Sequence, residues 1–202
     1  MMFITIEGID GSGKTVQAQR LVEKLTQRGR SVHWTREPGD WPSGAAVRSL
    51  LLTGQLKHPM SELLLFMADR CEHVKQVILP ALEAGKYVVC ERYNDSTLAY
   101  QCWGRGVDRS VADQLTEWCS LPVPDLTFWL DLTAEEAWKR RQSRGGGDRI
   151  EDEELGFHRL VACGFGALAA REPHRIFRVD ASRGPGEVAS DIENELRRRE
   201  AL

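Results

Sequence analysis

The stretch EGIDGSGKTVQ, residues 7–17, decides the fold of this chain. It follows the apolar run FITI, residues 3–6, and from Gly8 to Thr15 it has the spacing Gly-x-x-x-x-Gly-Lys-Thr. Glycine readily adopts a positive φ and lets the backbone approach a ligand closely. A glycine-rich loop of this kind turns several backbone N–H groups toward one point, which suits an anion.

The residues after this loop predict a helix over 14–28 that stops near Gly29. Its apolar residues recur at roughly helical spacing, at Val16, Leu21, Val22 and Leu25. The positive end of the helix dipole then points at the loop. Lys14 is expected to reach the outer phosphates of a nucleoside triphosphate, and the Thr15 hydroxyl is expected to bind Mg²⁺. A glycine-rich turn without a ligand is the alternative, but both flanks match what the motif requires.

The length, composition and net charge of the chain limit the classes of protein to which it can belong. The chain has 202 residues, 42% of them hydrophobic and 28% charged, which indicates one soluble domain over residues 1–202 with a single core. The net charge of −3 gives no basic character that would favour binding to nucleic acid. No apolar stretch is long enough for a membrane span, and the N-terminus MMFITIEG has no secretion leader, so we expect a cytoplasmic protein with no membrane partner.

The five cysteines indicate free thiols rather than a metal site. None of them falls in a Cys-x-x-Cys pair, and their number is odd. Buried or half-buried thiols in a reducing cytoplasm explain this pattern more simply than metal ligands do.

The chain alternates between short β-rich runs and longer helical patterns. Strands are predicted at residues 3–9, 31–37, 86–92, 125–132 and 174–180. Helices are predicted at about residues 14–28, 43–53, 59–84, 110–119, 133–143, 152–170 and 186–198. This alternation predicts an α/β fold, in which a parallel sheet of these five strands has helices on both faces. Ligands of such sheets bind beyond the carboxyl ends of the strands.

Charged residues follow two of the predicted strands. Arg36 and Glu37 leave the second strand just before Pro38, which ends regular structure. Glu91 and Arg92 leave the third strand directly after its apolar run. A carboxylate beside a phosphate loop is well placed to hold Mg²⁺, directly or through water, and an arginine there suits bidentate binding of a phosphate. Surface salt bridges at charged strand ends are the alternative.

Two further segments are candidates for ligand contact. Phe66 and Arg70 lie one turn apart in the predicted helix 59–84, where the ring can stack on a base and the arginine can bind one of its oxygens. A core position for Phe66 is the alternative. Residues 140–152 hold three glycines between arginines and acidic residues, which is typical of a mobile lid over a nucleotide. A solvated charged loop is the alternative there.

Together these motifs resemble the thymidylate kinase family, in its bacterial type with lid arginines. The segments EGIDGSGKT, TREPG, LLFMADR, ERYNDSTLAYQ and RQSRGGGDRIE follow one another in the order of that family, nearly end to end. The resemblance implies a P-loop nucleoside monophosphate kinase fold and ATP-dependent phosphorylation of dTMP to dTDP in dTTP biosynthesis. It also implies Mg²⁺ as the cofactor and a homodimer, for which the apolar helix 59–84 can offer an interface.

The resemblance further implies roles for particular residues. ATP binding falls to the phosphate loop: Gly8, Ile9, Asp10, Gly11, Ser12, Gly13, Lys14 and Thr15. Binding of dTMP falls to Asp10, Arg36, Phe66, Arg70, Arg92, Ser96, Tyr100 and Gln101. The catalytic set is Lys14, Asp10, Arg92, Arg144 and Arg149, since the loop has no arginine and the lid is expected to supply one, with Arg140 behind them. Thr15 and Glu91 are the residues expected at the metal, Glu91 directly or through water.

Three positions depart from the pattern of that family. Glu91 stands where an aspartate is usual, Val16 where a second threonine is usual, and Asp40 where a glycine is common. Two other functions stay open: a kinase for another small acceptor on the same fold, and a nucleotide-binding regulatory protein that has lost phosphoryl transfer. Arg36 and Arg92 favour a monophosphate acceptor over a nucleoside, because both are expected to face a phosphate.

Overall fold

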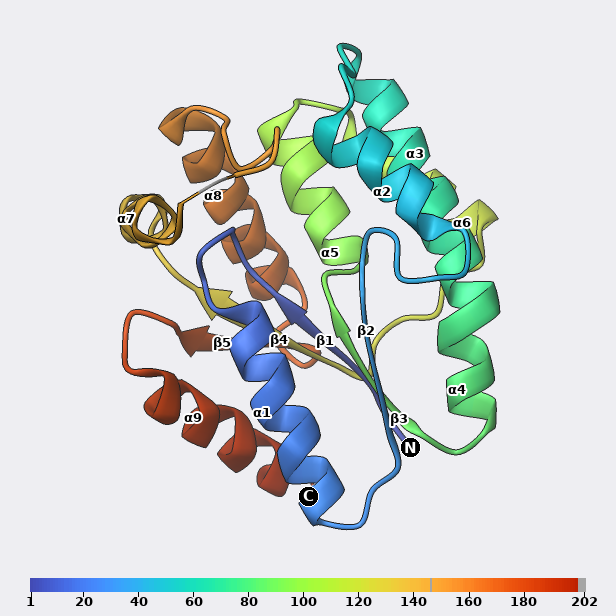
Figure 1. Ribbon diagram of the computed structural model, residues 1–202, viewed down its shortest axis with the longest axis vertical. Helices are drawn as coiled ribbons and strands as arrows, with labels where there is room; N and C mark the ends of the chain where they lie inside the picture. The colour runs from blue at the N-terminus through green and yellow to red at the C-terminus, as the bar shows by residue number, and fades with distance from the viewer. Residues whose placement is uncertain (146, 200–202) are drawn as a thin grey trace.

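A parallel sheet of five strands forms the centre of the molecule (Figure 1). The computed structural model describes residues 1–145 and 147–199. The strands are β1 (Phe3–Glu7), β2 (Val32–Arg36), β3 (Tyr87–Glu91), β4 (Leu126–Asp131) and β5 (Ile176–Asp180), in the spatial order β2-β3-β1-β4-β5. Every adjacent pair is parallel, and each strand lies within its predicted range. The predicted sheet is therefore confirmed.

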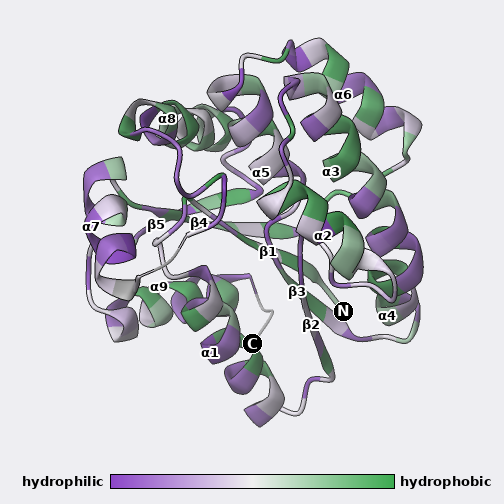
Figure 2. Cartoon of the chain, turned by 45° about the horizontal axis from the view of Figure 1, so that its top comes forward, coloured by the Kyte–Doolittle hydropathy of each residue, from purple (hydrophilic) through white to green (hydrophobic). Residues whose placement is uncertain are grey.

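The inner strands β1, β3 and β4 are sequences that suit burial on both faces of a sheet. All residues of β1 and β3 are buried, including Glu7 and Glu91 at their carboxyl ends. Figure 2 shows many hydrophobic residues along the strands, whereas α7 (Ala134–Arg144) is mainly hydrophilic. A parallel sheet covered on both faces needs such continuous apolar runs, and a polar residue at the end of one is positioned by the sheet itself.

Helices cover both faces of the sheet, as predicted. The helices α1 (Lys14–Gln27) and α9 (Pro185–Arg198) pack against each other on one face (Figure 1). On the other face lie α8 (Leu155–Arg171) and a long helix made of α3 (Pro59–His73), η1 (Val74–Ile78) and α4 (Leu79–Glu83). Two shorter helices are α2 (Gly44–Thr53) and α6 (Arg109–Trp118). None of the described helices is both long and apolar enough to cross a membrane.

One helical segment was not predicted. Residues 94–104 form α5 (Asn94–Thr97) and the π-helical η2 (Leu98–Gly104). The first turn has the sequence NDST, whose short polar side chains favour caps and turns over helix interiors. Packing supplies the missing stability, because η2 lies along α8 and Gly164 lets the two helices approach: a Cβ there would lie 3.0 Å from the Cβ of Trp103.

The register of the sheet brings the predicted site residues to one edge. Glu91 at the end of β3 is level with Ile6 of β1 and with Arg36 of β2. The phosphate loop leaves β1 one residue after Glu7, and α7 follows β4 on the other side of the loop (Figure 1). The carboxyl ends of neighbouring strands therefore surround a single region, which is where ligands bind in sheets of this type.

Candidate active site

The phosphate loop has the backbone that its glycines predict. Gly8, Gly11 and Gly13 have φ values of 143°, 91° and 93°. A Cβ on Gly8 would lie 2.7 Å from the carbonyl oxygen of Leu130, and one on Gly11 would lie 2.8 Å from that of Ala137. The loop is thus packed against β4 and α7 and needs glycine at both positions. Ser12 closes the turn, because its backbone N–H donates to the carbonyl of Ile9 at 3.2 Å.

Lys14 lies folded over this loop. Its Nζ donates to the carbonyl oxygens of Gly8 at 3.0 Å and Ile9 at 2.9 Å, and it lies 3.9 Å from a carboxylate oxygen of Asp10. Burial, followed by the charge of Arg92, lowers the pKa of Lys14 to about 8. A bound anion would favour the charged ammonium, so the lysine is suited to respond to a phosphate.

Thr15 and Glu91 meet as the sequence predicts. The Thr15 hydroxyl donates to Glu91 Oε2 at 2.6 Å, and the indole N–H of Trp34 donates to Glu91 Oε1 at 3.1 Å. Each oxygen of the Glu91 carboxylate therefore accepts a hydrogen bond, and one of these bonds comes from Thr15 in the first turn of α1. No cluster of three or more histidine, cysteine or acidic side chains suitable for a metal occurs among the described residues. A threonine hydroxyl with one carboxylate fits a cation that keeps most of its water, as Mg²⁺ does.

Asp10 and Arg92 form the centre of the site. The Arg92 guanidinium makes an ion pair with Asp10 Oδ1 and donates to the Gly8 carbonyl and to Ser96 Oγ, each at 3.2 Å. The Tyr100 hydroxyl donates to Asp10 Oδ2 at 2.8 Å. Burial alone would raise the pKa of Asp10, but the charges of Arg92 and Lys14 outweigh it and hold that pKa below its usual range. Asp10 therefore stays ionised.

Two cavities meet at this pair. The loop cavity, of about 340 Å³, is lined by the phosphate loop, Arg36, Glu91 and two arginines of α7. The inner cavity, of about 130 Å³, is lined by Phe66, Arg70, Ser96, Tyr100 and Gln101 among others. The residues lining both are Asp10, Glu37, Arg48, Arg92 and Glu151. Of the residues predicted to bind ATP, the loop cavity is lined by Asp10, Gly11, Gly13, Lys14 and Thr15, whereas Gly8, Ile9 and Ser12 line neither cavity. All the residues predicted to bind dTMP line the inner cavity except Arg36, which lines the loop cavity.

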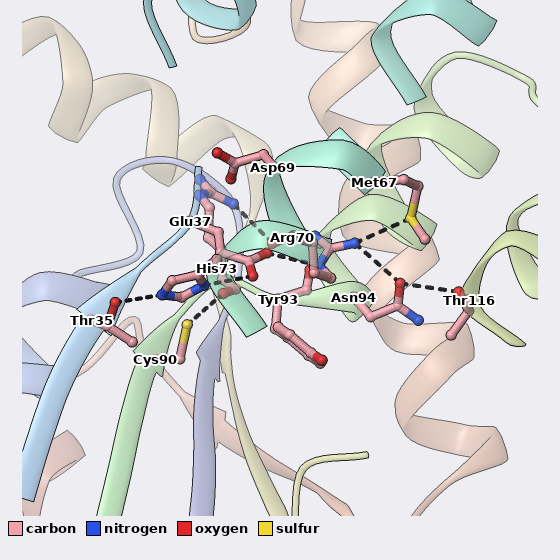
Figure 3. Close-up of polar contacts among 12 residues, drawn as sticks. Thr35, Glu37, Met67, Asp69, Arg70, His73, Cys90, Tyr93, Asn94 and Thr116 are labelled. Carbon is pink, nitrogen blue, oxygen red and sulfur yellow. Dashed lines mark hydrogen bonds and ion pairs between the residues drawn. The ribbon is translucent and has the colours of Figure 1, made fainter. Parts of the chain in front are cut away.

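The inner cavity has a polar wall built on α3. Arg70 is 1% exposed, and its Nε donates to Glu37 Oε2 at 2.7 Å (Figure 3). Its two terminal nitrogens donate to the Tyr93 carbonyl at 3.0 Å and to Asn94 Oδ1 at 3.2 Å. Phe66, one turn earlier on α3, is partly buried and lines the same cavity. The arginine is thus held by groups from two segments, the turn after β2 and the start of α5.

Of the arginine side chains that the structure describes in the predicted lid segment, residues 140–152, one lies away from both cavities. Arg149 does not line either cavity: its guanidinium donates to Glu62 Oε2 at 2.5 Å and to the Leu51 carbonyl at 2.9 Å. Arg140 lines the loop cavity and donates to the Ala181 carbonyl at 2.9 Å. The side chain of Arg144 lies outside the described part of the chain. Arg149, predicted as a catalytic arginine, is therefore bound to Glu62 and Leu51 in this structure and lies outside both cavities.

Two arginines at the site were missed. Arg141 is 6% exposed, donates to the Asp10 carbonyl at 3.1 Å and lines the loop cavity, and one of its terminal nitrogens is buried with no partner in the described part of the chain. Arg48 of α2 lines both cavities and donates to the Pro38 carbonyl at 2.8 Å. In the sequence, Arg48 stands out only as a lone arginine in the apolar run AAVRSLLL. Arg141 stands out only by its place in a cluster of arginines.

Comparison with known proteins shows the family of this chain. The family model described as thymidylate kinase matches residues 6–192. A thymidylate kinase of Synechococcus sp. (strain JA-2-3B'a(2-13)) is 52% identical over 192 residues, which cover 95% of this chain and 92% of the relative. One of Pelotomaculum thermopropionicum is 47% identical over 195 residues, covering 94% and 90%. The crystal structure of thymidylate kinase from Ehrlichia chaffeensis superimposes with a TM-score of 0.80 at 36% identity, covering 96% of this chain and 98% of that chain. The chain belongs to the thymidylate kinase family.

Proposed function

We propose that this chain transfers the γ-phosphoryl group of ATP to the phosphate of dTMP, giving ADP and dTDP for dTTP biosynthesis. The observation that carries the proposal is the shared wall of the two cavities, in which Asp10, Arg48 and Arg92 take part. A triphosphate on the phosphate loop and a monophosphate entering from the inner cavity meet at this wall. Holding both reactants in line is the main requirement of phosphoryl transfer.

The charges at the site support this assignment of the two ligands. Lys14 and Arg141 lie on the side of the phosphate loop, and Arg48 and Arg92 lie in the shared wall, where an acceptor phosphate would sit. Arg36 lines the loop cavity beside them. The acceptor oxygen of a monophosphate is largely ionised at neutral pH, so no strong general base is needed. The work of the protein is then positioning and neutralisation of charge on the transferred group. Asp10 holds Arg92 in place and stays ionised while it does so.

We also propose Mg²⁺ as the cofactor of this reaction. Thr15 and Glu91 are the residues that would hold it, Glu91 directly or through water. When bound, Mg²⁺ neutralises charge on the β- and γ-phosphates. Trp34 keeps the Glu91 carboxylate oriented for this role.

The inner cavity suits a pyrimidine nucleotide. We assign Phe66 to stacking on the base, Arg70 to one of its ring oxygens, and Ser96, Tyr100 and Gln101 to the rest of the base and sugar pocket. Arg144 stays in the proposal as a lid arginine that acts on the transferred phosphoryl group. For Arg149 we propose an anchoring role instead, because its ion pair with the buried Glu62 ties the lid segment to α3.

We further propose a domain organisation, an oligomeric state and a location for this chain. We expect a single domain with a lid at about residues 140–152, a homodimer, and a cytoplasmic location. Leu64 on α3 is 48% exposed and Trp118 on α6 is 75% exposed, and these two helices contact each other, so this face supports pairing of two copies. The five cysteines are free thiols, which suits a reducing compartment.

The direct test is ADP formation from ATP and Mg²⁺ with dTMP, dUMP, thymidine, dCMP, AMP and GMP, beside a sample without acceptor. Preference for dTMP supports the proposal. Preference for another acceptor moves the function to a related kinase, and retained ATP binding without turnover moves it to a regulatory protein. Sedimentation of the purified chain at several concentrations tests the homodimer separately.

A further inference from the structure

A buried chain of hydrogen-bonded side chains leads from β2 to Arg70 (Figure 3), which lines the inner cavity. His73 Nδ1 lies 2.9 Å from Glu37 Oε1, and Glu37 Oε2 accepts from Arg70 Nε at 2.7 Å. On the far side of the ring, His73 Nε2 lies 2.6 Å from Thr35 Oγ1. The order Thr35, His73, Glu37, Arg70 therefore links β2 to the wall of the cavity through side chains alone.

Every member of this chain is shielded from water. His73 is 0% exposed, Arg70 1%, Thr35 2% and Glu37 4%. A carboxylate accepts hydrogen bonds and cannot donate, so His73 Nδ1 carries the hydrogen that faces Glu37. Each Glu37 oxygen thus receives one donor, and losing either donor would leave a buried acceptor without a partner.

The geometry restricts the carboxylate to one orientation. Arg70 and His73 lie one turn apart on the same helix, α3, and both point at Glu37. Thr35 fixes the rotation of the imidazole from the neighbouring strand. With Glu37 held in this way, the Arg70 guanidinium has one preferred plane, in which it also reaches the Tyr93 carbonyl. Space filling alone would not need these polar groups, since an apolar side chain fills a core at lower cost.

We propose that His73 is a positioning residue for binding of the dTMP base: it orients Glu37, and Glu37 orients Arg70 toward the inner cavity. The proposal rests on the proposed function, in which Arg70 binds a ring oxygen of thymine. His73 touches no ligand in this scheme and acts only through Glu37. Its removal is therefore expected to weaken dTMP affinity while leaving ATP binding and kcat largely unchanged.

The experiment compares five variants with the wild-type protein by calorimetric titration of dTMP and of ATP and by steady-state kinetics. His73→Leu removes the donor to Glu37, whereas His73→Asn keeps an N–H donor near the position of Nδ1. Ile78→Ala is the matched control, because this buried residue follows on the same long helix and lies outside the chain from Thr35 to Arg70. Arg70→Gln, alone and combined with His73→Leu, tests whether the effect passes through Arg70.

We expect His73→Leu to raise the Kd and KM for dTMP about tenfold, with the values for ATP and kcat within about twofold of wild type. His73→Asn is expected to restore dTMP affinity. Ile78→Ala is expected to lower Tm without changing dTMP affinity. In the Arg70→Gln background, His73→Leu should add nothing. Wild-type dTMP affinity in folded His73→Leu overturns the proposal, as does equal weakening of dTMP and ATP, or a full further loss in the Arg70→Gln background.

The same titrations separate this inference from the proposed function. A wild-type protein that binds dTMP but transfers no phosphoryl group contradicts the proposed function and leaves the role of His73 to be decided by the Kd values. A wild-type protein that does not bind dTMP overturns both.

Discussion

Arg92 and Asp10 form an ion pair at the place where the loop cavity and the inner cavity meet. Arg92 comes directly after β3 and has a φ of 63°, a left-handed conformation that is uncommon for a residue with a side chain. Its backbone N–H donates to the Ile6 carbonyl at 3.0 Å, which continues the sheet for one residue beyond β3. The sheet and the phosphate loop thus jointly fix a guanidinium between the two cavities.

Replacing Asp10 by asparagine tests the importance of this pair. The variant keeps the size of the side chain but removes the charge that holds Arg92, so kcat/KM for dTMP is expected to fall about 10- to 100-fold. Steady-state kinetics with dTMP as the varied substrate measure the effect. Asp131→Asn is the control, because that carboxylate pairs with the exposed Arg178 at the surface. An unchanged kcat/KM in Asp10→Asn would remove Asp10 from the mechanism.

Arg141 is expected to act on the transferred phosphoryl group. Arg141→Ala removes a buried guanidinium from the loop cavity, so kcat should drop about 100-fold or more while the KM for dTMP changes only a few-fold. The neighbouring Lys139 is exposed, and Lys139→Ala provides the matched control on the same helix. If kcat of Arg141→Ala stays at the wild-type value, the catalytic arginine has to come from elsewhere in the lid.

Glu91 is expected to determine the Mg²⁺ concentration that the enzyme needs for activity. Glu91→Gln keeps a partner for the Thr15 hydroxyl and for Trp34 but loses the charge that attracts the cation. The Mg²⁺ concentration for half-maximal activity should then rise about tenfold. Glu23→Gln, on an exposed part of α1, is the control for a change in net charge. A Mg²⁺ titration that coincides for wild type and Glu91→Gln would argue against a metal role of this carboxylate.

The elements with strong local signals were predictable from the sequence. The five strands follow from short apolar runs, and the phosphate loop follows from the spacing of Gly8, Gly13 and Lys14, because both depend on neighbouring residues in the chain. Segment 94–104 was missed for the opposite reason. Its first turn, NDST, has the local preference of a loop, and only contact with α8, distant in sequence, makes it helical.

The direction of individual side chains depends on contacts that no motif encodes. Arg141 and Arg149 belong to the same basic segment, yet one lies over Asp10 and the other binds Glu62 on α3. Tertiary packing decides which of the two arginines lies at the cavity, and the number of arginines in the segment does not. His73 shows the same limit, since a single histidine on a helix predicts nothing until the fold brings Glu37 to it.

Glu7 gives the fold a specific dependence on pH. This fully buried carboxyl accepts from the Tyr93 N–H at 2.7 Å and from Ser96 Oγ at 2.5 Å. Burial, followed by the charge of Asp95, raises its pKa from 4.5 to about 7. The folded state therefore binds a proton more tightly than the unfolded state does. The stability that Glu7 contributes is present below pH 4.5 and is lost as the pH rises toward 7, by roughly 3 kcal/mol.

Glu7→Gln should remove this dependence, since glutamine resembles the neutral acid and does not titrate. The free energy of unfolding, measured by urea denaturation at several pH values, should rise in the variant relative to wild type by roughly 3 kcal/mol between about pH 4.5 and 8. Activity is not the readout here, because Ser96 lines the inner cavity. A constant difference between the two proteins over this range would mean that Glu7 is ionised throughout.

Phe66 is the residue for which a core role and a binding role make different predictions. It is partly buried, packs against the core and lines the inner cavity, so the structure gives it both kinds of contact. If it stacks on thymine, Phe66→Ala should raise the KM for dTMP about tenfold with little change in kcat or in the KM for ATP. Phe66→Trp, which keeps an aromatic face, should retain most of the affinity. A fall in Tm with unchanged dTMP affinity would place Phe66 in the core alone, and Arg70 would then be the remaining contact to the base from α3.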